Sequence, residues 1–244
     1  MGNARNRVFV VGVGMTKFEK PGRREGWDYP QMANESGTKA LQDAGIDYTE
    51  CEESSRPLIV GERTNEVGSR KFKRLIEDEK FEEAAEVGRA QVKAGAQLID
   101  INLQNADRDE ARDIERFYEK IIRMVKVPIV IDTTNAAALE MALTYCQGKS
   151  IINSINFEDG QEKLDRVVPL AKKFGAALIF GTIDDDKLQA QAITVERKLA
   201  IAERAHRELT QNFGFPEQDI LWDPLVFPCG TGDKNYVGSA ALTI

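Results

Sequence analysis

From residue 57 onward, short runs rich in Val, Ile and Leu alternate with longer segments in which apolar residues recur every three or four positions. The short runs are typical of buried parallel strands, and the longer pattern is typical of helices with one apolar face. The alternation therefore predicts an α/β fold, in which strand–helix units build a parallel sheet. We expect six strands, at residues 57–60, 98–103, 127–131, 150–155, 176–181 and 220–223.

Two of the intervening segments show the helical pattern most clearly. One carries Ile114, Phe117, Tyr118 and Ile121 on a single face, and the other ends at Phe174 with Gly175 directly after it. A glycine in that position is typical of a helix C-terminus, because the residue there often adopts a left-handed conformation. Both segments are predicted to pack on the sheet through their apolar faces.

The first 50 residues form a separate predicted strand–helix unit. An apolar run at 8–13 is followed by a loop containing Pro21 and Gly22 and by a helix from 31 to 44. Residues 51–56 are polar and are interpreted as a linker. The predicted domains are therefore 1–50, a linker at 51–56, and 57–244.

Composition and charge exclude several classes of protein. The chain has 42% apolar and 30% charged residues, with no uncharged apolar run of the roughly 18 residues that a membrane span needs. The N-terminal apolar stretch is too short for a signal peptide, so we expect a cytoplasmic protein. The net charge is −7, and acidic and basic residues are interspersed, so no basic face that would bind nucleic acid is expected. One histidine and three widely spaced cysteines argue against Ser-His or Cys-His catalysis, a zinc site and a disulfide framework.

Polar side chains follow most of the predicted strands. In parallel α/β barrels the carboxyl ends of the strands meet at one mouth, where ligands bind. Each residue alone has a structural explanation, such as an interior salt bridge for Asp100, but the set as a whole indicates a ligand with many hydrogen-bond donors. A pterin fits, because its pyrimidine edge presents ring N–H and amino groups. The candidates are Glu62, Asn65, Asp100, Asn102, Asp132, Asn153 and Asp223.

Several of these residues lie in longer motifs. The chain contains Gly61-Glu62-Arg63-Thr64-Asn65, Asp100-Ile101-Asn102, Ile131-Asp132, Gly148-Lys149-Ser150-Ile151-Ile152-Asn153-Ser154-Ile155 and Asp223-Pro224. In order and spacing the region 57–240 resembles the pterin-binding domain of cobalamin-dependent methionine synthase and related methyltetrahydrofolate methyltransferases. The resemblance implies a TIM-barrel-like fold.

The resemblance also implies roles for the candidates. Asp132, Asn153 and Asp223 would hold the pterin ring and form the catalytic site, while Glu62, Asn65, Asp100 and Asn102 would line the first two strand ends. The implied reaction transfers the N5 methyl group of methyltetrahydrofolate to cob(I)alamin on a separate domain or protein. Corrinoid-binding and homocysteine-binding partner domains would supply the rest of methionine synthesis.

The chain departs from this family in two respects. The family barrel has eight strands, and here we expect the series to stop after the sixth, without the seventh-strand Asn that lies near N5 in relatives. Binding of pterin without turnover, an inactive barrel and, less favoured, a dihydropteroate synthase-like condensation therefore stay open. In addition, residues 1–50 resemble the start of the thiolase domain of sterol carrier protein x, which suggests a chimera but no thiolase activity.

Overall fold

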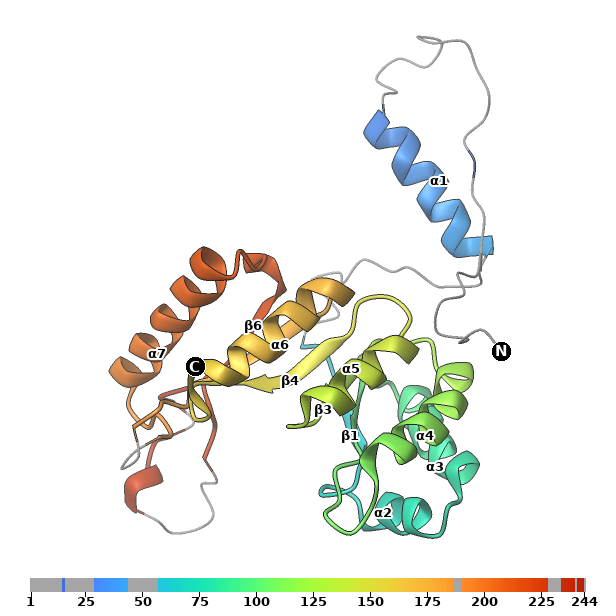
Figure 1. Ribbon diagram of the computed structural model, residues 1–244, viewed down its shortest axis with the longest axis horizontal. Coiled ribbons are helices and arrows are strands. Elements are labelled where there is room, and N and C mark those ends of the chain that lie inside the picture. Colours follow the sequence, from blue (N-terminus) through green and yellow to red (C-terminus); the bar gives the residue numbers. More distant parts are fainter. Residues whose placement is uncertain are drawn as a thin grey trace. The chain divides into compact units, whose positions relative to one another are not determined.

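The chain forms two compact units, Met1–Leu58 and Ile59–Ile244. A computed structural model describes residues 15, 29–43, 57–186, 190–227, 234–239 and 241–243. In the first unit it describes helix α1 (Tyr29–Asp43), which corresponds to the helix predicted at 31–44 (Figure 1). The strand predicted at 8–13 and the linker predicted at 51–56 lie outside the described residues.

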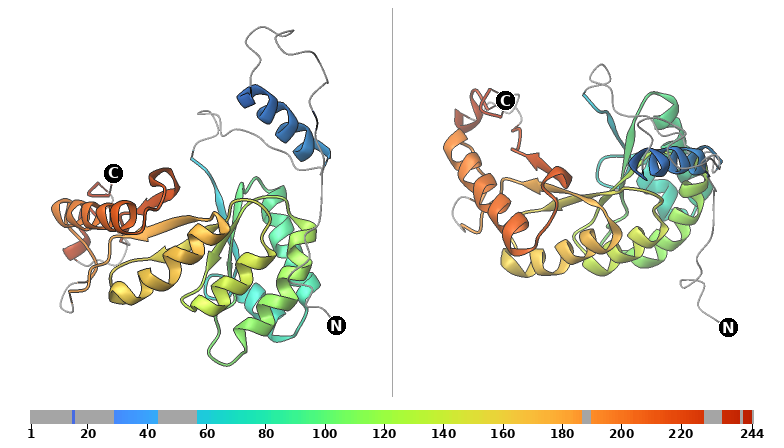
Figure 2. Two further views of the ribbon diagram at one scale, coloured as in Figure 1. Left: turned by 45° about the horizontal axis from the view of Figure 1, so that its top comes forward. Right: turned by 90° about the horizontal axis from the view of Figure 1, so that it is seen from above.

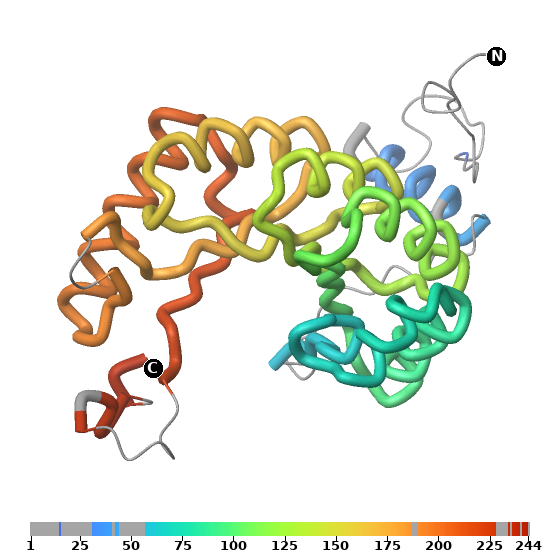
Figure 3. Tube along the Cα trace, turned by 60° about the horizontal axis from the view of Figure 1, so that its bottom comes forward, coloured from blue at the N-terminus to red at the C-terminus, as the bar shows by residue number. Residues whose placement is uncertain are grey.

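The second unit contains a six-stranded parallel sheet whose strands follow one another in chain order. The strands are β1 (Val60–Asn65), β2 (Leu98–Asn102), β3 (Ile129–Asp132), β4 (Ile151–Ile155), β5 (Ala177–Gly181) and β6 (Ile220–Asp223). Figure 3 shows this order as a steady progression of colour along the sheet. The predicted α/β class with a TIM-barrel-like arrangement is confirmed. Among the strands that the structure describes, β1 and β6 are the two edges of the sheet.

Helices cover one face of this sheet in an arc, with the strands on its inner side (Figure 2). They are α2 (Arg70–Glu77), α3 (Phe81–Lys93), α4 (Glu110–Met124), α5 (Ala136–Tyr145), α6 (Gly160–Phe174) and α7 (Val195–Arg207), the last continued by a π-helical turn at Glu208–Asn212. Short 3-10 turns lie at Glu217–Asp219 and Lys234–Tyr236. As predicted, Gly175 ends α6 in a left-handed conformation with φ of 66°.

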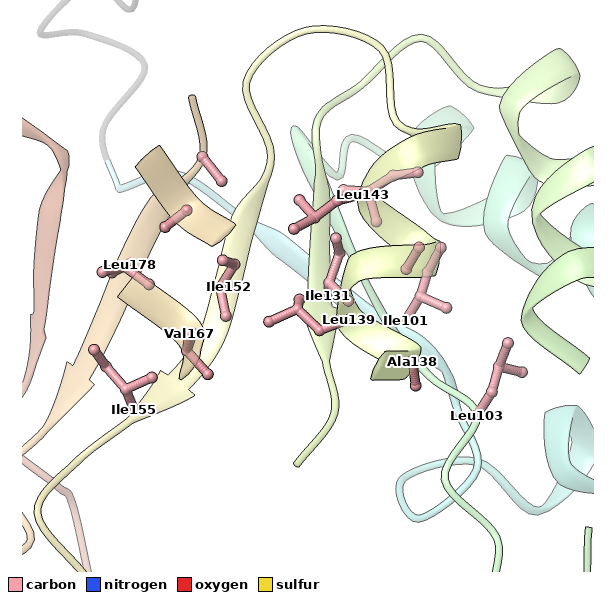
Figure 4. Packing of buried hydrophobic residues seen from close by; sticks show 14 of the residues in the cluster. Ile101, Leu103, Ile131, Ala138, Leu139, Leu143, Ile152, Ile155, Val167 and Leu178 are labelled. Carbon is pink, nitrogen blue, oxygen red and sulfur yellow. The ribbon is translucent and has the colours of Figure 1, made fainter. Parts of the chain in front are cut away.

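The core lies between the helices and the outer face of the sheet. Ile101, Ile131, Ile152 and Leu178 are successive register partners on β2 to β5, and none is more than 2% exposed. Figure 4 shows this row beneath side chains of α5 and α6, including Leu139 and Val167. Burying each such side chain contributes about 1.5–3 kcal/mol before the entropy cost of ordering it. This row fixes which face of each strand points away from the helices.

The prediction for the first strand was wrong in position. β1 begins at Val60 and continues through the polar residues to Asn65, whereas residues 57–60 were predicted. The register of β1 against β2 pairs Val60 with Leu98 and Asn65 with Asn102, so the polar stretch itself forms the ladder. An edge strand with one face away from the helices tolerates such residues, and apolar patterning therefore missed it.

Candidate functional site

The candidate residues share the face of the sheet opposite the helices. Asp100, Val130, Ile151 and Ala177 are successive register partners on β2 to β5, in the row next to the buried one. Because side chains alternate between faces along a strand, Asn102 and Asp132 lie on the same side as this row. On β5, Gly181 shares the side of Ala177, and it pairs with Asp223 of β6. Asn65, Asn102, Asp132 and Asp223 are the last residues of their strands, whereas Asp100 and Asn153 are the middle residues of β2 and β4.

Asparagine side chains join the first three strand ends. Asn65 Nδ2 donates to Asp100 Oδ2 at 2.8 Å and to Asp132 Oδ2 at 3.1 Å. Asn102 Nδ2 donates to the same Asp132 oxygen at 3.0 Å. The two amides are oriented in turn by backbone N–H groups, since Asn65 Oδ1 accepts from Val67 and Gly68 and Asn102 Oδ1 accepts from Gln104. Two carboxylates are therefore held side by side by fixed donors.

Asp100 is the deepest acid of this group, with only 2% of its surface exposed. Burial raises the pKa of Asp100 from 3.8 to about 6, and the negative charges of Asp132 and Glu62 add to the rise, whereas hydrogen bonds from Asn65 and Asn153 oppose it. The carboxyl group therefore exchanges its proton close to neutral pH. Glu62 itself is exposed on β1.

Asn153 connects the fourth strand to this cluster. Its Nδ2 donates to Asp100 Oδ1 at 3.5 Å, a long hydrogen bond, and its Cα pairs directly with that of Asp132. Asp223 lies apart from the hydrogen-bonded group, on β6, where its Oδ1 accepts from the Leu225 N–H at 2.9 Å. The structure thus brings Asn65, Asp100, Asn102, Asp132 and Asn153 together, and it places Asp223 on the same face two strands beyond Asn153.

Three of these side chains keep an acceptor oxygen for a ligand. Among the described residues, no hydrogen bond reaches Asp132 Oδ1, Asn153 Oδ1 or Asp223 Oδ2. These are partly or fully exposed side chains, so the free oxygens face solvent on the side away from the helices. Carboxylate and amide oxygens of this kind accept hydrogen bonds from N–H groups.

Other polar residues near the strand ends have structural roles. Thr133 Oγ1 donates to Glu110 Oε1 at 2.6 Å, and Asn135 caps α5 by accepting from the Ala137 N–H at 3.0 Å. Asp184 and Asp185 form ion pairs with Arg204, so this loop is more than a solvated turn. His206 contacts Glu217 at 3.1 Å on the helical side and lies outside the polar cluster.

Sequence reasoning missed two buried charged residues close to the site. Glu66 follows Asn65 directly; its Oε2 accepts from Asn105, whereas its buried Oε1 has no partner in the described part of the chain. Burial raises the pKa of Glu66. Lys198 on α7 is only 5% exposed. Its position, three residues before buried Ile201 and seven before buried Ala205, is an apolar-face position, and that spacing is the signal that could have identified it.

A sequence profile of the family described as "Pterin binding enzyme" matches residues 61–243, about three quarters of the chain. This chain belongs to the pterin-binding enzymes. The match covers all six strands except Val60, and it includes every candidate residue. Membership of this family confirms the coarser part of the predicted resemblance.

Solved structures of pterin-binding enzymes share the fold. Dihydropteroate synthase of Yersinia pestis, solved with a pterine–sulfa conjugate, is 20% identical with a TM-score of 0.52, over 78% of this chain and 67% of that one. The Xanthomonas albilineans enzyme is 18% identical with a TM-score of 0.51, over 81% and 70%. The Vibrio fischeri enzyme is 15% identical with a TM-score of 0.52, over 75% and 67%. At such identity the likeness speaks for the fold alone.

Some predictions receive no support from these findings. The similar structures are dihydropteroate synthases and not methionine synthase, and neither thiolase nor cobalamin is indicated.

No described helix is long and apolar enough to cross a membrane. Within the described ranges, no group of three His, Cys, Asp or Glu side chains could hold a metal ion. Cys146, the one cysteine in those ranges, is a free thiol whose pKa burial raises to about 11.

Proposed function

We propose that this pterin-binding enzyme binds methyltetrahydrofolate through Asp132, Asn153 and Asp223 and supports transfer of its N5 methyl group to a cob(I)alamin acceptor. The observation that carries the proposal is the set of three acceptor oxygens on one face of the sheet that have no hydrogen-bond partner among the described residues, next to a buried acid. The motifs of β1 to β6 favour methyltetrahydrofolate over other pterins because they resemble the methyltransferase branch of the family.

The acceptors match the donors of a pterin ring. The carboxylates of Asp132 and Asp223 accept from N–H groups, and Asn153 Oδ1 adds a neutral acceptor between them in strand order. A hydrogen bond from a ligand N–H to a carboxylate contributes about 1.5–3 kcal/mol where water is displaced. Asn65 and Asn102 keep Asp132 oriented for this contact.

Methyl transfer requires a change of protonation on the ring. As the N5–methyl bond breaks, its electron pair stays on N5, which is a poor leaving group unless it gains a proton. Neighbouring negative charges at Asp100 and Asp132 favour a protonated ring by electrostatic attraction. Asp100, with its pKa near 6, is mostly ionised at pH 7 and so contributes to this attraction.

The methyl acceptor would come from elsewhere. Cob(I)alamin, when bound on a partner domain or protein, supplies the nucleophile for the methyl carbon. The polar groups on the face of the sheet opposite the helices accept hydrogen bonds from N–H donors. We therefore assign that face to the pterin, and the corrin to the partner. A homocysteine-binding partner would complete methionine synthesis.

Calorimetric titration with methyltetrahydrofolate tests the binding part of the proposal. Asp132→Ala and Asn153→Ala should each weaken binding by about tenfold or more, because each removes one oriented acceptor. Asp165→Asn, which changes an exposed acid on α6, should leave affinity unchanged. Wild-type affinity in both alanine variants would sink the site assignment.

Turnover assays distinguish the alternatives that share this site. Methyl transfer to free cob(I)alamin that disappears in Asp223→Ala supports the methyltransferase reaction. Binding of methyltetrahydrofolate without any transfer would favour a binding protein. Formation of a bond between a pterin and 4-aminobenzoic acid would favour the dihydropteroate synthase-like condensation, for which the shared fold is the supporting observation.

A further inference from the structure

Lys198 is a buried ammonium group that the proposed reaction does not use. It lies in the first half of α7 with 5% of its surface exposed. Its Nζ donates to the backbone carbonyl of Leu225 at 3.0 Å and to Thr243 Oγ1 at 2.8 Å. Burying a lysine is costly unless its ammonium group is hydrogen-bonded, and these two acceptors reduce that cost. The contacts also tie α7 to the residues after β6.

The carbonyl that Lys198 holds belongs to an unusual residue. Leu225 has a positive φ of 58°, one of two non-glycine residues with positive φ in the described part of the chain. This conformation is disfavoured for leucine, because its Cβ approaches the following carbonyl oxygen, and it persists only where neighbours enforce it. The same residue directs its N–H at Asp223 Oδ1, at 2.9 Å. Lys198, Leu225 and Asp223 therefore form one connected chain of contacts.

Charge links the two ends of that chain. Burial lowers the pKa of Lys198, and the negative charge of Asp223 opposes this lowering. The C-terminal turn contributes as well, since Thr243 Oγ1 also donates to the Leu225 carbonyl at 2.8 Å. The loop after β6 is thus held from α7 and from the last described turn.

We propose that Lys198 is a positioning residue for the pterin site, which holds Leu225 in its left-handed conformation and so fixes the Asp223 carboxylate for the ligand. This inference rests on the proposed function, because Asp223 matters here only as a pterin-binding group. Lys198 touches neither the ring nor the reacting atoms. It acts through the peptide groups of Leu225.

A double-mutant cycle measured by titration with methyltetrahydrofolate tests this role. Lys198→Met should weaken binding about tenfold in the wild-type background, because the Leu225 carbonyl loses its charged donor and the Leu225 N–H no longer holds Asp223 in place. In an Asp223→Ala background the same change should alter affinity less than about twofold, because no carboxylate is left to position. A lysine with a purely structural role would weaken binding equally in both backgrounds.

Two further variants sharpen the test. Lys172→Met is the matched control, because Lys172 also donates to a backbone carbonyl, that of Phe213, but lies on α6 away from the polar cluster; its affinity should equal that of the wild type. Leu225→Gly combined with Lys198→Met should recover most of the lost affinity, because glycine adopts positive φ without support. If Lys198→Met does not unfold cooperatively, Lys198→Gln, which keeps a neutral donor, replaces it in the cycle with an expected loss of about threefold.

The outcomes separate the inference from the proposed function. Binding by the wild-type protein, loss in Asp223→Ala and full affinity in Lys198→Met would overturn the role of Lys198 and leave the proposed function standing. Equal losses in both backgrounds would overturn it too. Failure of the wild-type protein to bind methyltetrahydrofolate would overturn the proposed function and this inference with it.

Discussion

At the scale of single residues, the site depends on one amide group that serves two acids. Asn65 Nδ2 donates to Asp100 and to Asp132, so a neutral side chain bridges the two carboxyl groups. The cost of this arrangement falls on Asp100, which is the more buried of the two and carries the raised pKa. A group of this kind destabilises the fold in its charged form.

This leads to a prediction for the pH dependence of stability. The pKa of Asp100 is higher in the folded protein, about 6, than its ordinary value of 3.8, so its favourable contribution is complete below about pH 4 and is lost as pH rises through 6. Asp100→Asn should therefore gain stability relative to the wild type between pH 4 and pH 7, by about 2–3 kcal/mol. Urea denaturation across this range measures the difference.

Asp165→Asn provides the control for that series, because Asp165 is exposed on α6. Its difference from the wild type should not vary over the same pH range. A flat difference for Asp100→Asn as well would mean that Asp100 titrates near its ordinary value in the folded protein.

The candidate residues could be predicted at this scale for a physical reason. Asp100, Asp132, Asn153 and Asp223 all terminate or interrupt β-branched runs, so the strand pattern located them before any contact was known. The strand pattern does not mark Glu66 or Lys198, and for Lys198 only its spacing on the apolar face of α7 indicates burial. Their importance depends on which side chains surround them after folding, and a single sequence contains that information only indirectly.

At the scale of secondary-structure elements, polar residues that follow one strand have different roles. Some keep an oxygen that could accept from a ligand, and others cap the next helix. Asp132 ends β3 and keeps a free oxygen, whereas Asn135, three residues later, accepts from the Ala137 and Ala138 N–H groups at the start of α5. Asp132 and Asn135 are both polar residues that follow the same predicted strand. Their roles differ because Asn135 directly precedes the first residue of α5 and Asp132 does not.

Asn135→Ala should therefore affect stability and leave binding intact. Loss of the N-cap is expected to cost about 1 kcal/mol, or roughly 2–4 °C in the midpoint of thermal unfolding for a domain of this size. The affinity for methyltetrahydrofolate should stay at the wild-type value. Asn135→Ser, which keeps a capping oxygen, is the control and should restore most of the stability. A loss of affinity in Asn135→Ala would assign Asn135 to the binding site.

Elements with strong apolar runs were predictable, and the polar first strand was not. The last strand was predicted to the residue, and those beginning near 98, 150 and 176 to within one residue at each end. β1 is held by its pairing with β2 and carries Glu62, Arg63 and Asn65, so neither propensity nor alternation marks it as a strand. Long-range pairing decided this element, and local sequence does not record it.

At the scale of the whole molecule, the buried apolar cluster of the described residues lies in the second unit. Every residue of the buried apolar cluster lies between Phe72 and Ile220, on α2 to α7, β2 to β6 and the loops that connect them. No described member comes from α1. The division of the chain into Met1–Leu58 and Ile59–Ile244 agrees with this distribution.

Residues 57–244 should therefore fold without the preceding segment. We expect this fragment to unfold cooperatively, with a midpoint within about 3 °C of the full chain and the same affinity for methyltetrahydrofolate, because domains with their own core fold alone. Circular dichroism melting and calorimetric titration of both proteins measure this. A large drop in the midpoint would show that residues 1–56 contribute to the stability of the second unit.

The chain-order arrangement of the sheet has a consequence for how the protein is made. Each strand pairs with the one synthesised just before it, from β1 through β6, and no strand inserts between two earlier ones. A nascent chain can therefore add one strand and one helix at a time to a growing edge. Each parallel pairing must still close a loop as long as a whole strand–helix unit, as from Val60 to Leu98, and this slows each addition. Asp223 lies on β6, the last of the described strands, so the proposed set of pterin acceptors is completed only when that strand has docked.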